Sequence, residues 1–264
     1  MIGREIKEMS KRLAMTTDGR MTYCSASDAN IGKGRCNHII HQNKNENSND
    51  FIKRVEELKE DLNNKVNSQS RIDRIKAAKQ KYGLDKLIND KEMIVRIEVA
   101  KQGYGLDKLI NDDNWWVRQT VAEQGYGLDK LINDDNDYVR AEVARQGYKL
   151  DELINDKSEY VRKVVAEQGY GLDKLVNDEN WMVKVEVAKQ GYGLDKLIKD
   201  NSYLVRKEVA RQGYGLDTLI DDKNSDVRVE VARQGYGLDK LVNDYHPYVQ
   251  QSALVRKKIL SEEL

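Results

Sequence analysis

Helix-breaking residues and membrane-spanning runs are what this sequence lacks. Its 264 residues include a single proline and a single phenylalanine. The chain is rich instead in lysine, glutamate, leucine, valine and alanine, a composition typical of helical proteins. No apolar run approaches the roughly 20 residues that a membrane-spanning helix needs, and residues 1–6 lack the apolar core of a signal peptide. We therefore expect an all-helical soluble protein in the cytoplasm, without a membrane partner.

Charge is unevenly distributed along the chain, although the formal net charge is zero. Residues 1–81 carry 17 lysines and arginines against 11 aspartates and glutamates, whereas residues 82–264 carry 28 against 34. Affinity for nucleic acid comes mainly from neutralising phosphates with basic side chains. If this protein binds nucleic acid, the N-terminal residues are therefore the better candidates.

A unit of 22 residues occurs eight times in tandem. Each copy has the form Y-G-L-D-K-L-I-N-D, then four variable residues, then V-R-x-x-V-A-x-Q-G. The copies begin at Tyr82, Tyr104, Tyr126, Tyr148, Tyr170, Tyr192, Tyr214 and Tyr236. Self-similarity at a fixed period of about 20–50 residues is the mark of solenoid proteins, in which neighbouring repeats stack on one another.

The copy that begins at Tyr104 shows why each unit should contain two helices. One apolar stripe at helical spacing consists of Val117, Val121 and Ala122. Gly125 follows that stripe, and a glycine just past a helix supplies the left-handed closing conformation at little cost. A shorter apolar stripe lies within residues 106–110 and predicts one or two turns of α or 3₁₀ helix.

A single unit has too few apolar side chains to offset the conformational entropy of ordering 22 residues, so the units must stack. The end copies are atypical, as capping requires: residues 74–80 are a degraded long helix, and Ala253-Leu254 replaces Val-Ala. We predict an all-α, right-handed α-solenoid of eight 22-residue two-helix repeats at residues 82–257. Capping helices at 51–81, with an amphipathic helix over 51–66, should precede it, and a short tail at 258–264 should follow.

The unit resembles the leucine-rich repeat variant family, a helical relative of HEAT repeats. The resemblance rests on the pattern D-x-x-x-x-V-R-x-x-V-A, as in Asp112 to Ala122 or Asp222 to Ala232, and covers residues 71–257. The chain departs from the family in having Gly-Tyr-Gly where a proline-rich connection is usual. The resemblance implies a superhelix of alternating α and 3₁₀ helices. It implies a binding scaffold in general terms, because one repeat architecture serves many partners.

The two residues before the valine of each long helix vary most between the copies, and all three tryptophans lie there. Exposed tryptophan and tyrosine often carry the binding energy of an interface. We therefore predict an aromatic ridge that binds a partner, made of Trp115, Trp116, Tyr138, Tyr160, Trp181, Met182 and Tyr203. The alternative is that these side chains fold over the neighbouring repeat and are half buried. Packing would favour one residue type in every copy, whereas all eight pairs differ.

A basic residue follows the valine in seven copies: Arg96, Arg118, Arg140, Arg162, Lys184, Arg206 and Arg228. We call this set the arginine ladder. It could hold phosphates along a groove, or it could pair with the aspartates fixed in each unit, such as Asp85 and Asp90. The acidic balance of the repeats favours pairing with aspartate.

Residues 1–50 share nothing with the repeats and are expected to form a small irregular module with a short helix over Arg4 to Leu13. Both cysteines and two of the three histidines fall within 18 residues, as Cys24, Cys36, His38 and His41. Four such ligands suit one structural Zn²⁺ in a module with little core of its own. A Cys24–Cys36 disulfide or free thiols remain alternatives. Between the cysteines, Lys33 and Arg35 lie in a glycine loop that is a weak candidate for binding an anion.

No clustered serine, histidine and aspartate, and no Walker loop, accompanies these features. The function expected from the sequence is therefore a non-catalytic scaffold that binds another protein, with no small-molecule substrate. The alternative is a HEAT-like protein that binds nucleic acid through the N-terminal module and the arginine ladder.

Overall fold

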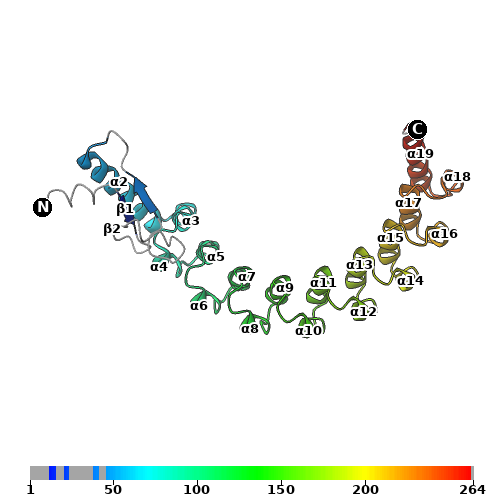
Figure 1. Ribbon diagram of the computed structural model, residues 1–264, viewed down its shortest axis with the longest axis horizontal. Helices are drawn as coiled ribbons and strands as arrows, with labels where there is room; N and C mark the ends of the chain where they lie inside the picture. Colours follow the sequence, from blue (N-terminus) through cyan, green and yellow to red (C-terminus); the bar gives the residue numbers. More distant parts are fainter. Residues whose placement is uncertain (1–11, 16–20, 24–37, 42–45, 263–264) are drawn as a thin grey trace. The chain divides into compact units, whose positions relative to one another are not determined.

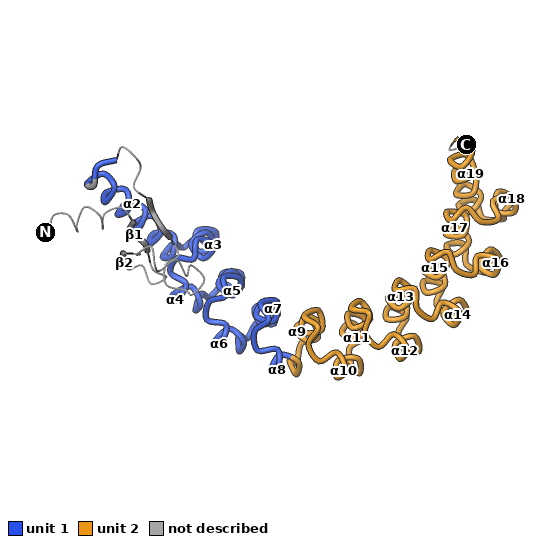
Figure 2. The backbone as a smooth tube through the Cα atoms, viewed as in Figure 1, with its two compact units in different colours: residues 1–131 blue, residues 132–264 orange. Residues whose placement is uncertain are grey.

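The computed structural model describes residues 12–15, 21–23, 38–41 and 46–262. It divides into two compact units, residues 1–131 and 132–264 (Figure 2). Apart from three short strands, every element of the described residues is a helix. None of those helices is both long enough and apolar enough to span a membrane.

The three strands form an antiparallel sheet in the order β2-β1-β3. They are β1 (Arg12–Met15), β2 (Met21–Tyr23) and β3 (His38–His41). Leu13 pairs with Tyr23 on one side and with Ile40 on the other. The predicted helix over Arg4 to Leu13 is therefore wrong at its C-terminal end, because pairing with two strands overrides the local helical spacing. The remainder of that prediction lies outside the described residues.

The helices of the first unit begin with two that precede the repeats and continue as alternating short and long helices (Figure 1). The first two are α2 (Ser48–Asn67) and α3 (Arg71–Lys79). The repeats supply α4 (Leu84–Leu87), α5 (Met93–Lys101), α6 (Leu106–Leu109), α7 (Trp115–Glu123) and α8 (Leu128–Leu131).

The second unit continues the alternation and ends on a longer helix (Figure 1). Its long helices are α9 (Asp137–Arg145), α11 (Glu159–Glu167), α13 (Trp181–Lys189), α15 (Tyr203–Arg211), α17 (Ser225–Arg233) and α19 (Pro247–Glu262). Its short helices are α10 (Leu150–Leu153), α12 (Leu172–Leu175), α14 (Leu194–Leu197), α16 (Leu216–Leu219) and α18 (Leu238–Leu241). Each long helix from α9 to α17 packs against the next long helix.

The apolar stripes predicted from the repeat form the core between stacked helices. In α13, Val183, Val187 and Ala188 are fully buried, and the equivalent valines and alanines of the other interior repeats are buried in the same way. Leu175 and Val176 of the preceding short helix complete this layer. The helical solenoid of stacked 22-residue units is therefore confirmed.

The short elements are single α-helical turns flanked by tighter 3₁₀-type bonds. In α12 the amide of Val176 donates to the carbonyl of Leu172, four residues back, whereas the amide of Asn177 donates to Lys174, three residues back. The 3₁₀ helices implied by the resemblance are thus only the ends of these turns. Gly193, which begins the next short helix, has a φ of 61°, and a Cβ there would lie 2.5 Å from a methyl group of Val176. Both the backbone conformation and the available space therefore favour glycine at that position.

Both ends of the array are closed by helices that differ from the repeats. At the N-terminal end α2 buries Phe51, Val55 and Leu62 and packs on α3, and the Tyr82 hydroxyl donates to Asn63 Oδ1 at 2.8 Å. This confirms the predicted capping helix at 51–66. At the other end α19 runs on to Glu262, so the boundary predicted at residue 257 falls inside a helix.

Candidate partner-binding surfaces

The arginine ladder holds neighbouring repeats together. Arg140 donates from Nε and Nη2 to the two carboxylate oxygens of Asp156 in the next repeat, at 2.7 and 2.8 Å. Its Nη1 donates to the carbonyl oxygens of Asp134 and Asp135, at 2.8 and 3.2 Å. The amide of Ser158 donates to the same Asp156 carboxylate. The planar fork of arginine therefore holds three backbone or carboxylate groups together at the contact between two repeats, which we call a seam.

The same arrangement recurs in both units. The two-bond pairs are Arg74–Asp90, Arg96–Asp112, Arg162–Asp178, Arg206–Asp222 and Arg228–Asp244, and Lys184 bonds Asp200 in the equivalent place. The Arg228 hydrogen bond lowers the pKa of Asp244. Burial pushes the pKa of Asp222 upward, but bonds from Arg206 and from the amide of Asn224 outweigh burial and lower it. These arginines use their donors within the fold, which argues against phosphate binding by the ladder.

The predicted aromatic ridge lies at the first turn of the long helices, and none of its side chains is in the core. Trp116, Tyr138, Trp181 and Tyr203 are exposed, with 44, 47, 43 and 38% of their surface accessible. The remaining members, Trp115, Tyr160 and Met182, are half buried. The side chains that vary between repeats therefore form part of the surface rather than of the stacking core.

Ring contacts show that ridge residues lie against one another within each of the two compact units. In the second unit Tyr138 and Tyr160, which occupy one register in adjacent repeats, have ring centroids 5.1 Å apart. Arg145 donates to the Tyr160 hydroxyl at 2.7 Å. In the first unit Trp115 and Trp116 stack with centroids 6.1 Å apart. Tyr138 and Tyr160 thus form a continuous aromatic surface across a repeat seam.

The positions beside the ridge are less exposed than the helical spacing predicts. Helical spacing alone places Ile97 and Glu98, and their equivalents, beside the ridge and away from the valine and alanine stripe. Ile97 is instead buried, and Glu142, the equivalent of Glu98, is only 6% accessible. The Glu142 carboxylate accepts hydrogen bonds from Arg145 at 3.1 Å and from Gln146 at 3.0 Å. A glutamate could be buried here because its neighbours in the same helix satisfy it.

A second row of aromatic side chains was missed from the sequence. The tyrosine that opens each repeat is fixed in all eight copies, and no surface role was predicted for it. The structure leaves 41–43% of the surface of these tyrosines exposed at Tyr126, Tyr170, Tyr192, Tyr214 and Tyr236. Only the first, Tyr82, is buried. The polar and glycine neighbours in Q-G-Y-G-L-D were the available signal of an exposed position.

The predicted metal and anion sites fall largely outside the described residues. Cys24, Lys33, Arg35 and Cys36 all lie there, while His38 and His41 begin and end β3. Within the described part of the chain, no group of three or more histidine, cysteine, aspartate or glutamate residues is arranged to hold a metal ion. The zinc site therefore stays a prediction from the sequence.

No protein-family model matches the chain, and no curated protein matches it either. The structure shows a helical repeat protein. Its resemblance to the leucine-rich repeat variant family rests on the D-x-x-x-x-V-R-x-x-V-A residues alone.

Proposed function

We propose that the protein is a non-catalytic scaffold that binds another protein through the aromatic ridge. The observation that carries this proposal is the exposure of large aromatic side chains in the one register where the repeats differ. Trp181 and Tyr138, the centres of this surface in the second unit, are both more than two-fifths exposed. Exposed tryptophan and tyrosine side chains have a high hydrophobic cost in water, which a partner would relieve.

The chemistry of the ridge favours a protein over other partners. Successive copies present different pairs, from Trp115-Trp116 to Asp137-Tyr138 and Trp181-Met182. A surface that changes at every step matches a partner whose own surface changes, as a folded protein's does. Nucleic acid would require available basic groups, whereas the ladder arginines bond aspartates and the repeats are acidic overall. The nucleic-acid alternative therefore depends on the N-terminal residues.

A capture experiment with matched variants tests the proposal. Immobilised wild-type protein should retain a specific protein from an extract of its host cells, and Tyr138→Ala/Trp181→Ala should lose it. Leu254→Ala/Ile259→Ala is the control, because it removes exposed apolar side chains from α19, away from the ridge. Retention by the ridge variant, or equal loss in the control, would contradict the proposal. Circular dichroism should show that all the variants remain helical.

A further inference from the structure

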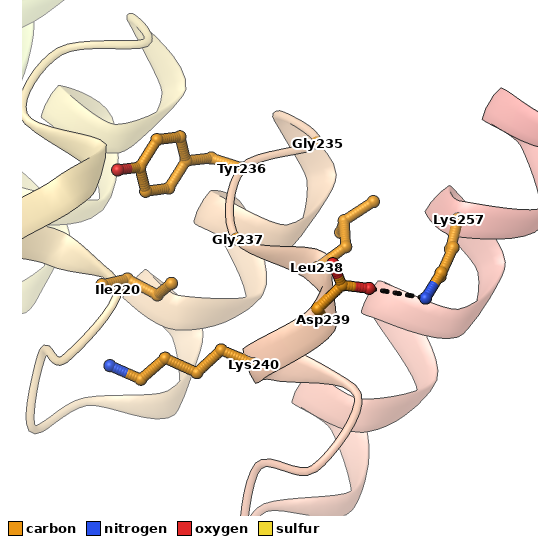
Figure 3. A pocket seen from close by; sticks show the side chains of 8 residues that line it. All are labelled: Ile220, Gly235, Tyr236, Gly237, Leu238, Asp239, Lys240 and Lys257. Atoms are coloured by element: carbon orange, nitrogen blue, oxygen red, sulfur yellow. Dashed lines mark hydrogen bonds and ion pairs between the residues drawn. The ribbon is translucent and has the colours of Figure 1, made fainter.

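The last repeat carries a lysine, Lys257, at a sequence position that is glycine in the interior repeats. Lys257 of α19 reaches back to α18, where its Nζ lies 2.6 Å from Oδ1 of Asp239 (Figure 3). The contact lies in an open depression that Gly235 and Leu238 also line. Both charged side chains are more than half exposed, and the ion pair lowers the pKa of Asp239.

In the interior repeats the position of Lys257 is a glycine. Lys257 follows Asp239 by 18 residues, and at the same distance Gly191 follows Asp173 and Gly213 follows Asp195. A Cβ built on either glycine would meet no atom within 4 Å. The surroundings of these two glycines are therefore open, and the last repeat carries a lysine at the corresponding sequence position.

The aspartates of those interior seams are fixed in sequence and exposed. Asp173 and Asp195 both lie at the surface, and neither makes an ion pair within the described residues. Every unit keeps this aspartate, although the variable positions show that exposed residues have diverged freely between copies. Each lies in the first turn of its short helix, where the helix dipole favours a carboxylate, and its exposure leaves the carboxylate accessible to a partner as well.

The exposed tyrosines contribute an aromatic face to the same seams. In Figure 3, Tyr236 extends toward the preceding repeat, which carries Ile220, whereas Asp239 extends the other way, toward α19. Because the repeats are equivalent, each interior seam receives an aspartate from the earlier repeat and a tyrosine from the later one. Tyr192 and Tyr214, each about two-fifths exposed, are the tyrosines of the two seams described above. Exposed carboxylates and exposed aromatic rings both attract an ammonium or guanidinium group.

We infer that these seams form a row of cation sites that takes lysine or arginine side chains from a basic segment of a partner protein. Lys257 is the chain's own lysine in the last site of the row. Each exposed contact is weak, so affinity arises from several identical sites engaged at once. The acidic excess of residues 82–264 attracts a basic segment and repels nucleic acid. The row follows the C-terminal ends of the long helices, whereas the ridge lies at their N-terminal ends, so the two surfaces can be tested separately.

Binding of a fluorescent oligolysine peptide tests the row directly. Asp173→Asn/Asp195→Asn should weaken binding about tenfold, since each of the two substitutions removes one exposed cation contact without changing side-chain shape. Asp226→Asn/Glu179→Gln is the matched control: it removes two exposed carboxylates near the N-terminal ends of the long helices, away from the row, and should change affinity less than about twofold. Equal weakening in the two double variants would mean that net charge alone attracts the peptide, and would overturn the inference. Absence of oligolysine binding by the wild-type chain would overturn it as well.

The last seam offers a test in the opposite direction. Lys257→Ala should free the Asp239 site and tighten oligolysine binding by about twofold, because one more identical site becomes available. Lys199→Ala, which removes an exposed lysine away from this row, is the control for the change in net charge. Equal tightening in both variants, or none in Lys257→Ala, would contradict the role assigned to Lys257.

Discussion

The two ends of each long helix are both exposed, yet they follow opposite rules in sequence. At the N-terminal ends the pair of residues before the valine differs in every repeat, as Trp115-Trp116, Asp137-Tyr138 and Trp181-Met182 show. At the C-terminal ends the same exposed tyrosine recurs, as Tyr170 and Tyr192 show. Variation suits contact with the particular features of one partner, whereas uniformity suits a chemical group that the partner repeats. Identity between repeats is therefore not by itself a sign of burial.

Folding depends on the buried contacts between stacked helices rather than on these two exposed surfaces. The largest effect on stability should therefore come from disturbing a buried contact. Val143 lies in the second half of α9 and is fully buried. Val143→Asp would place an unpaired charge among apolar side chains and should destabilise the protein by about 3–5 kcal/mol. Urea unfolding followed by circular dichroism measures this effect.

The control for that variant is Asn177→Asp, which adds the same charge at an exposed position. It should change the free energy of unfolding by less than about 0.5 kcal/mol. If Val143→Asp and Asn177→Asp had equal effects, the helix face assigned to the seam would be incorrect.

A smaller effect, on stability in acid, should come from the aspartates that pair with the arginine ladder. The pKa values of Asp156, Asp222 and Asp244 are lowered in the folded protein by their arginine partners. A carboxylate with a lowered pKa contributes stability that is present above its unfolded pKa, about 3.9, and is lost as pH falls through the folded value. Stability should therefore be constant near neutral pH and fall below about pH 4.

Asp222→Asn sharpens this test, because it leaves Arg206 without its charged partner. The variant should be less stable than the wild type at pH 7, and the difference should shrink as the pH falls below about 4. Urea unfolding at a series of pH values gives both curves. A difference that stays constant over the whole range would show that the ladder carboxylates titrate normally.

The sequence predicted the stacking core because the valines and alanines of each unit recur at helical spacing without interruption. It did not predict the burial of Glu142, since a glutamate in a helix is usually exposed and only the three-dimensional structure shows its bonds to Arg145 and Gln146. Pairing of Arg140 with Asp156 was likewise one of two choices, because each unit fixes two aspartates. The exposed tyrosines were missed because identity between copies does not distinguish an exposed residue from a buried one. Which side chains pair and which are exposed depends on how the repeats stack, and the sequence of one repeat does not contain that information.

A stabilising effect of about 0.5–1 kcal/mol is expected from replacing Lys149 by glycine. Lys149 stands where the other repeats have glycine and adopts a φ of 47°, a conformation unfavourable for side chains with a Cβ. Lys149→Gly should relieve that strain at the loss of an exposed ion pair with Glu152. The reverse change, Gly193→Lys, should destabilise, because its Cβ would collide with Val176. Thermal unfolding compares the two, and a loss of stability in Lys149→Gly would contradict the strain.

The smallest effect on the array should come from the N-terminal cysteines. If Cys24, Cys36, His38 and His41 hold one zinc ion, protein purified without chelator should contain about one zinc per chain. Cys36→Ser should lower that content while the unfolding of the repeats stays unchanged. Elemental analysis measures the metal, and a well-folded wild-type protein without zinc would end the prediction.

The central claim is that the ridge side chains serve binding rather than folding, and the free energy of unfolding of Tyr138→Ala/Trp181→Ala tests it most directly. Both side chains are more than two-fifths exposed, so their truncation leaves no cavity in the core. The variant should unfold within about 1 kcal/mol of the wild type, and it should bind oligolysine with unchanged affinity. A loss of about 3 kcal/mol or more, as expected when a buried aromatic side chain is truncated, would contradict the account.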